Sequence, residues 1–112
     1  MATPAIDPVV FAELQATAGA EFTRELIDTF LEEAPPMLAG LREALAAASA
    51  EAFRRAAHSL KSNATTFGAQ ALAAMARELE LQGLAAATPA ALAALAQQYD
   101  AVAAELKALR NA

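Results

Sequence analysis

Apolar side chains recur every three or four residues along most of this chain, and glycine, proline or a helix-capping residue interrupts the pattern at a few points. This spacing places apolar groups on one face of an α-helix, whereas a half-buried strand needs strict alternation. Residues that favour helix are abundant, and no alternating β-branched run is present. A chain of 112 residues also has the size of one domain. The pattern therefore predicts a single all-α domain over residues 1–112.

Capping and stop residues divide the pattern into five helices. Short polar side chains cap helix starts, proline fits the first helical position, and glycine ends helices. The expected starts are Asp7-Pro8, Ser49 and Thr88-Pro89, and the expected stops are Gly19, Gly68 and Gly83. The predicted helices span about residues 8–18, 20–47, 50–67, 69–82 and 89–110.

The pair Pro35-Pro36 interrupts the second of these helices. Each proline lacks a backbone donor and crowds the carbonyl four residues earlier, so the pair permits either one kinked helix or two helices that meet there. The apolar stripe resumes at Leu38 with little change of phase, which favours one kinked element over residues 20–47. The predicted core stripe of this element is Phe22, Leu26, Phe30, Leu38, Leu41 and Leu45.

Each of the four longer helices carries one apolar stripe, and the turns between them are short. These features predict an antiparallel up-down four-helix bundle with a short extra N-terminal helix that covers one end. We expect residues 1–6 to be loose and residues 7–110 to be helical. The predicted stripes of the last three helices are Phe53, Ala57, Leu60, Ala64 and Phe67, then Leu72, Met75, Ala76 and Leu79, then Leu92, Leu95, Tyr99, Val102, Leu106 and Leu109.

Composition excludes several classes of site. The chain has no cysteine and one histidine, so we expect neither a disulfide nor a thiolate or imidazole metal site. The net charge of −5 argues against binding to nucleic acid, which needs a basic face. No apolar run is long enough to span a bilayer, and no signal peptide is recognisable. We therefore expect a cytoplasmic protein without membrane contact, and a closed bundle favours a monomer.

His58 is the only histidine, and the helical pattern places it outside the core. A helix advances about 100° per residue, and with Phe53 at zero the core stripe of this helix spans roughly −40° to +40°. On this scale His58 lies at about 140° around the helix axis, so it faces solvent. The same exposed strip holds two cations and two hydroxyls: Arg54, Lys61, Ser62 and Thr65.

This strip has a chemical implication, because imidazole is nucleophilic at neutral pH and can carry a covalent group. Lys61 lies one turn from His58 and would neutralise a phosphoryl group formed on the ring. The only carboxylate near the strip in this helix is Glu51, at its edge. An ordinary solvated helix face is the alternative interpretation.

The segment His58-Ser59-Leu60-Lys61, with Phe67-Gly68-Ala69 at its end, resembles the active segment of histidine-containing phosphotransfer (HPt) domains. That family's usual pattern is His-x-Leu-Lys-Gly, then small residues and a hydrophobic-Gly-Ala ending. Residues 30–35 look like the family's mid-helix proline segment, and residues 77–80 look like part of its fourth helix. The resemblance covers about residues 7–110, and the family's fold is the bundle that periodicity predicts.

The resemblance implies a role for each matching residue. His58 matches the phosphorylated histidine, Lys61 the lysine that steadies the phosphate, and Gly68 the glycine that ends the active helix. Glu80 falls where the family often places a Gln or Glu that reaches the imidazole, and a solvated helix charge is the alternative for it. Ser62 departs from the family's usual glycine, which puts transfer rate and partner fit in question.

The resemblance also implies a function. Such a protein accepts a phosphoryl group on histidine from a receiver-domain aspartate, or from a kinase, and passes it to another receiver. The expected partners are response-regulator receiver domains and a hybrid sensor histidine kinase. The chain has no nucleotide-binding loop, so we expect no kinase activity and no cofactor of its own, with Mg²⁺ on the receiver. Docking would use the face around His58, with Phe11, Ile27 and Leu31 as candidate contacts.

Two alternatives remain open at the level of sequence. The phosphoacceptor domain of a larger chemotaxis-type or hybrid kinase is one alternative, although we favour a free-standing protein. A helical interaction module without chemistry also fits an alanine-rich bundle with an acidic surface. Phosphorylation of His58 separates that module from the relay protein.

Overall fold

The computed structural model describes residues 4–112, and within them the chain forms five α-helices and one short 3₁₀ helix, with no strand. The elements are α1 (Pro8–Ala18), α2 (Ala20–Ala46), α3 (Ala50–Phe67), α4 (Gln70–Gln82), η1 (Gly83–Ala86) and α5 (Pro89–Arg110). Each α-helix begins and ends within one residue of its predicted boundary, and η1 occupies a stretch for which no element was predicted. The all-α prediction is confirmed.

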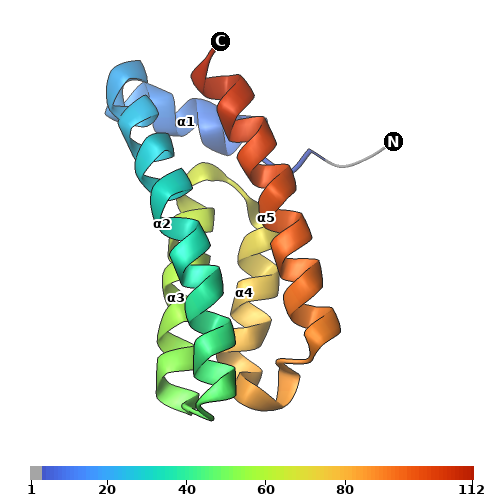
Figure 1. Cartoon of the computed structure of the whole chain (residues 1–112). Helices are drawn as coiled ribbons and strands as arrows, with labels where there is room; N and C mark the ends of the chain where they lie inside the picture. The colour runs from blue at the N-terminus through green and yellow to red at the C-terminus, as the bar shows by residue number, and fades with distance from the viewer. Residues whose placement is uncertain (1–3) are drawn as a thin grey trace.

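The four long helices surround one core. Figure 1 shows that the chain reverses direction after each of them, so α2, α3, α4 and α5 run antiparallel to their neighbours in the chain. Both α2 and α4 pack against α3 and against α5, which closes the ring. The helix α1 lies across the end of the bundle where α2 begins and α5 ends (Figure 1). The arrangement is the predicted up-down bundle with a short N-terminal helix.

The helix starts depend on the predicted capping residues. The side chains of Asp7, Ser49 and Thr88 each accept a hydrogen bond from a backbone N–H in the first turn, at 2.8, 3.3 and 3.0 Å. Each bond satisfies a donor that has no partner within the helix. Because the caps fix where the helices begin, they also fix which side chains face the core.

The core agrees closely with the predicted stripes of α3, α4 and α5. Among the stripe residues of these three helices only Met75 and Leu109 are partly exposed, and all the others are buried. The ring of Phe30 from α2 packs between Phe67 and Tyr99, with centroid separations of 5.4 and 5.9 Å. Aromatic contacts at these distances stabilise a core beyond their buried area. They join α2, α3 and α5 at one level of the bundle.

The predicted stripe of α2 is partly wrong. Phe22 is 52% exposed, while Leu26, Leu38 and Leu45 pack only at the edge of the core. The buried residues of α2 are Thr23, Ile27, Phe30, Ala34, Leu41 and Ala44. The buried face thus agrees with the prediction at Phe30 and Leu41, but lies one residue later at the start of the helix and one residue earlier at its end. The polar Thr23 is tolerated because its hydroxyl donates to the carbonyl of Gly19 at 2.7 Å.

Pro35 and Pro36 do not divide α2, which is one helix from Ala20 to Ala46. The prediction of one element is confirmed, and the kink at the prolines stays a prediction. Both prolines are exposed. The carbonyls that lose their helical donors therefore lie on the solvent side, where water can satisfy them. Ala34, directly before the pair, fills the position at which the predicted stripe had a gap.

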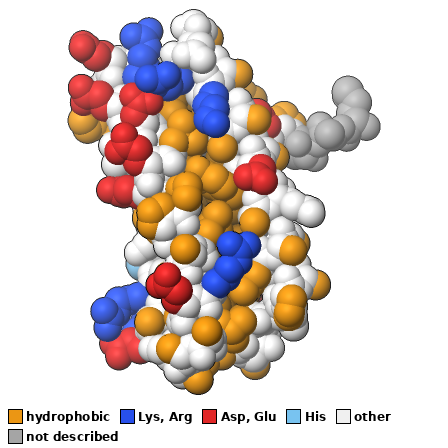
Figure 2. Space-filling model, viewed as in Figure 1, with side chains coloured by type: hydrophobic (Ala, Val, Ile, Leu, Met, Phe, Trp, Pro, Cys, Tyr) orange, Lys and Arg blue, Asp and Glu red, His pale blue; other side chains and the backbone are white. Residues whose placement is uncertain are grey.

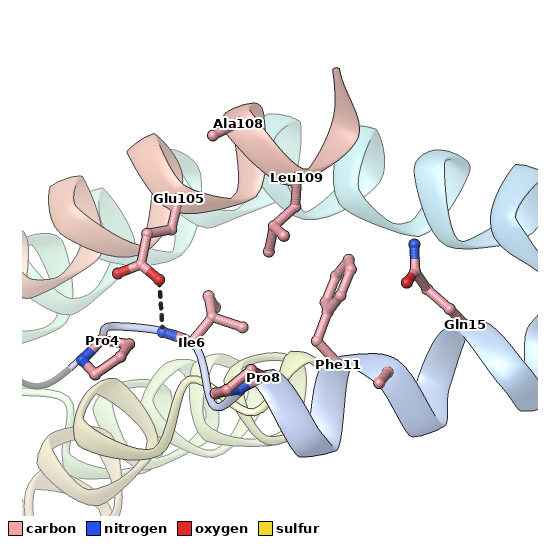
Figure 3. A pocket seen from close by; sticks show the side chains of 9 residues that line it. Pro4, Ile6, Pro8, Phe11, Gln15, Glu105, Ala108 and Leu109 are labelled. Carbon is pink, nitrogen blue, oxygen red and sulfur yellow. Dashed lines mark hydrogen bonds between the residues drawn. The ribbon is translucent and has the colours of Figure 1, made fainter. Parts of the chain in front are cut away.

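The N-terminal segment is not loose as predicted. Ala5 and Ile6 are buried, and the Glu105 carboxylate of α5 accepts a hydrogen bond from each of their backbone N–H groups. Figure 3 shows Ile6 beside Phe11 and Leu109, between α1 and α5. The prediction failed because a three-residue apolar segment has no periodicity, and its anchor lies about a hundred residues away. The predicted looseness of residues 1–3 falls outside the described residues.

Gly68 joins the end of α3 to the N-terminal segment. Its φ of 78° is left-handed, and its carbonyl accepts from the Asp7 N–H at 2.8 Å. A Cβ at this position would lie 2.7 Å from the Cβ of Val10, closer than side chains normally approach. Both the backbone conformation and the packing therefore require glycine here.

We predict that Gly68→Ala lowers the free energy of unfolding by about 1–3 kcal/mol, because alanine is strained at positive φ and collides with Val10. Gly40→Ala is the matched control. Gly40 lies inside α2, and an added Cβ would meet Ala56 only at 4.0 Å. That variant should gain about 0.5–1 kcal/mol. Urea unfolding followed by circular dichroism measures both, and a Gly68→Ala variant as stable as wild type would contradict this account.

Candidate functional site

His58 lies near the middle of α3, with 57% of its side chain exposed. The residues one position before and two after it in α3, Ala57 and Leu60, are fully buried. The predicted solvent-facing orientation of the imidazole is therefore confirmed. The ring is not isolated, because its Nδ1 lies 2.6 Å from Oε2 of Glu80, on the neighbouring helix α4.

The Glu80 carboxylate bridges two groups on α3. Its second oxygen, Oε1, accepts a hydrogen bond from Nζ of Lys61 at 2.6 Å. His58 and Lys61 are three residues apart and so share one face of α3, and the antiparallel packing of α4 brings Glu80 opposite both. Only 14% of the Glu80 side chain is exposed. Glu80 is therefore part of the site and is not a solvated helix charge.

The electrostatics of this trio keep the carboxylate ionised. The hydrogen bond from Lys61 is the largest cause that lowers the pKa of Glu80, the hydrogen bond from His58 adds to it, and partial burial opposes both. An ionised carboxylate can only accept hydrogen bonds. A neutral His58 ring that bonds to it must carry its proton on Nδ1, which leaves the lone pair of Nε2 free. The geometry thus selects the tautomer in which the outer nitrogen is a nucleophile.

The other predicted residues of the strip lie on the exposed surface of α3. Arg54, Ser62 and Thr65 are all exposed, and Lys61 is less so, with 28% of its side chain accessible. The Thr65 hydroxyl donates to the Lys61 carbonyl at 2.8 Å, so its proton is used within the helix. Within residues 4–112, Arg54 forms no ion pair, whereas the adjacent Arg55 pairs with Glu51 at 2.8 Å.

The predicted docking residues are mostly wrong. Phe11 and Ile27 are 4% and 1% exposed and belong to the core, so no partner can contact them without unfolding. Leu31 is partly buried against the core. In the described part of the chain, the large apolar side chains that are exposed are Val9, Phe22 and Leu81.

Two features of the site were missed in the sequence. The first is the ion pair between Lys61 and Glu80, because no local pattern reports which helices are neighbours. The second is the exposure of Leu81, at 65%. The sequence did contain a signal for this exposure, because Leu81 lies outside the apolar stripe that Leu72, Ala76 and Leu79 form on α4.

Other parts of the surface offer no comparable chemistry. No group of three or more His, Cys, Asp or Glu side chains in residues 4–112 is arranged to hold a metal ion. None of the described helices is long and apolar enough to cross a membrane. A pocket of about 430 Å³ lies between the N-terminal segment, α1 and the end of α5 (Figure 3). None of its lining residues comes from α3 or α4, so it is separate from His58.

Charged side chains are unevenly distributed over the molecule. Figure 2 shows acidic groups gathered over the first half of α2 and hydrophobic groups along the seam between α2 and α5. The acidic side chains of that half-helix are Glu21, Glu25, Asp28, Glu32 and Glu33. Asp28 is paired with Arg110 of α5. The cations Arg54 and Lys61 therefore stand apart from the main acidic surface of the protein.

Comparisons with known proteins identify the family of this chain. The crystal structure of histidine-containing phosphotransfer protein B (HptB) from Pseudomonas aeruginosa PAO1 superimposes with a TM-score of 0.87 and 32% sequence identity. The match covers 98% of this chain and 97% of that one. No curated protein sequence gives a significant match. The Hpt domain family matches residues 25–111, which include α3, α4 and the His58–Glu80–Lys61 trio. The chain therefore belongs to the Hpt domain family.

Proposed function

We propose that this protein is a phosphorelay intermediate that carries a phosphoryl group on Nε2 of His58. The group would come from an aspartyl phosphate on a receiver domain, or from a kinase, and would pass to the aspartate of a second receiver. The observation that carries the proposal is the 2.6 Å contact between His58 Nδ1 and Glu80, which leaves the outer ring nitrogen as the free nucleophile. Family membership supports a phosphotransfer role.

The proposed step is a displacement at phosphorus. The Nε2 lone pair forms the new N–P bond as the P–O bond to the donor aspartate breaks, and the aspartate leaves as a carboxylate. The ring, which still carries its proton on Nδ1, becomes positively charged. Glu80 offsets that charge because its carboxylate accepts the Nδ1–H. Return of the group to another aspartate reverses the same step.

The cations of the strip would offset the charge of the phosphoryl group. Lys61 lies one turn from His58, and Arg54 lies one turn on the other side, within reach of groups on the ring. Phosphoryl transfer depends mainly on positioning and charge neutralisation, which exposed cations can supply. Ser62 and Thr65 complete the surface that a partner would cover. Gly68 has a structural part, since it ends the helix that bears the site.

The proposal also specifies what this chain would not do itself. It would act as a carrier without kinase activity, and the receiver would supply Mg²⁺ and the reacting aspartate. The proposed partners are response-regulator receiver domains and a hybrid sensor histidine kinase, and the proposed location is the cytoplasm. We favour a single-domain monomer over residues 1–112, because His58 must remain accessible to successive partners.

We predict that His58→Gln abolishes phosphate acceptance and leaves the melting temperature within about 2 °C of wild type, because an exposed side chain contributes little to stability. The measurement incubates both proteins with phosphorylated receiver domains and Mg²⁺, and detects acid-labile label on a phosphate-affinity gel. Label on the variant equal to that on wild type would reject His58 as the acceptor.

We predict that Lys61→Ala slows transfer by at least about tenfold, because a charge-assisted contact to the phosphoryl group is lost. Arg55→Ala is the matched control, since Arg55 also lies three residues from His58 but is paired with Glu51. Rapid-quench kinetics with one receiver compare the two variants with wild type. Equal rates for Lys61→Ala and Arg55→Ala would remove Lys61 from the mechanism.

We predict that Glu80→Gln destabilises the protein at neutral pH and that this difference shrinks in acid. The pKa of Glu80 is lowered in the folded protein, so its ion pair stabilises the fold above the ordinary carboxyl pKa of about 4.3 and is lost as pH falls through the lowered value. Melting temperatures at pH 7 and at about pH 3 test this. Glu78→Gln is the control, because Glu78 bonds to Gln82. A pH-independent difference for Glu80→Gln would contradict the prediction.

A further inference from the structure

A partner that delivers a phosphoryl group to His58 must cover the surface around the ring. A stable interface buries about 800 Å² on each partner, which corresponds to a patch of about 16 Å radius. A patch centred on His58 includes the outer faces of α3 and of α4, because the ring itself contacts Glu80 on α4. The α4 side therefore lies within an interface of this size that is centred on His58.

Leu81 provides the apolar group on that side. It directly follows Glu80 in α4 and is 65% exposed. We measure the angle around the axis of α4 from the buried Ala76. Glu80 then lies at about 40°, toward α3, and Leu81 at about 140°, toward solvent. Leu81 thus lies on the open side of α4 at the level of His58.

The other two exposed apolar side chains are placed differently. Val9 lies in the first turn of α1 and Phe22 in the first turn of α2, and both helices begin at the end of the bundle that α1 covers (Figure 1). Neither neighbours a residue that contacts His58. Apolar side chains near the centre of an interface contribute most to binding, whereas those at its rim contribute little. Leu81 is therefore the side chain best placed to act as an anchor.

We propose that Leu81 is the apolar anchor with which a receiver domain docks across the α3–α4 face. This inference rests on the proposed relay function and adds a residue that sets partner affinity. Arg77, one turn before Leu81, and Arg54 on α3 add positive charge around the same face. The acidic side chains next to them are held by other groups: Glu51 pairs with Arg55, and Glu78 accepts a hydrogen bond from Gln82. Their sign complements an acidic, Mg²⁺-binding pocket on the receiver. The partner surface that fits is an apolar recess beside that pocket.

The test compares Leu81→Ser with Val9→Ser, which alters an equally exposed apolar side chain, 64% accessible, away from His58. Each variant receives phosphate from a phosphorylated receiver that labels wild type, and separately from a small phosphoramidate donor that needs no docking. We expect Leu81→Ser to lower the second-order transfer rate from the receiver at least about tenfold. Labelling by phosphoramidate and the melting temperature should not change, and Val9→Ser should match wild type. Leu81→Met should retain most of the rate.

Three results would overturn the proposal, and each would reject a different part of it. Wild-type transfer rates in Leu81→Ser, with His58 labelled, would reject the anchor and leave the relay function intact. A loss of phosphoramidate labelling in Leu81→Ser would mean that Leu81 supports the reactive ring and does not dock the partner. A wild-type protein that takes label from neither donor would reject the relay function and the anchor together.

Discussion

The hydrogen bonds of one carboxylate organise this site. Glu80 contacts His58 and Lys61 at 2.6 Å each, and in doing so it links α4 to the helix that bears the imidazole. A carboxylate held by a lysine stays ionised, and an ionised carboxylate fixes the proton of the ring on Nδ1. One side chain therefore sets the tautomer, the orientation of the ring and the resting position of the nearest cation.

That arrangement requires an accurate register between α3 and α4. The register is set by the core, where Leu60 and Ala64 of α3 are buried together with Leu72 and Ala76 of α4. It is also set by the turn at Gly68, whose left-handed backbone reverses the chain within two residues. A carboxylate displaced by one position on α4 would point about 100° away and would miss both partners. The packing of the buried faces of α3 and α4 thus determines which groups meet the ring.

The sequence specified most of the fold because its signals were local and repeated. Caps such as Asp7 and Ser49 and the stripe of α3 each depend on residues within one helix, and all were predicted correctly. The buried face of α2 and the burial of Ile6 were not predictable in this way, since they depend on neighbours distant in sequence. For the site, the orientation of His58 followed from periodicity. The Lys61–Glu80 ion pair required the spatial neighbour. The docking prediction failed at Ile27 because the buried face of α2 was misplaced, and at Phe11 because α1 buries that side chain against the bundle.

The proposed relay has to release its phosphoryl group as readily as it accepts it. A lysine held only by the phosphate would stabilise phosphohistidine and slow the next transfer. In this protein the lysine already has a partly buried partner in Glu80, so a phosphoryl group on His58 would compete with that carboxylate for one cation. An exposed arginine such as Arg54 remains beside the ring, but its solvated contacts are weak. A lysine shared in this way would stabilise the phosphorylated state less than a lysine bound only to the phosphoryl group. A carrier that works between two aspartates requires such a small free-energy difference between its free and phosphorylated states.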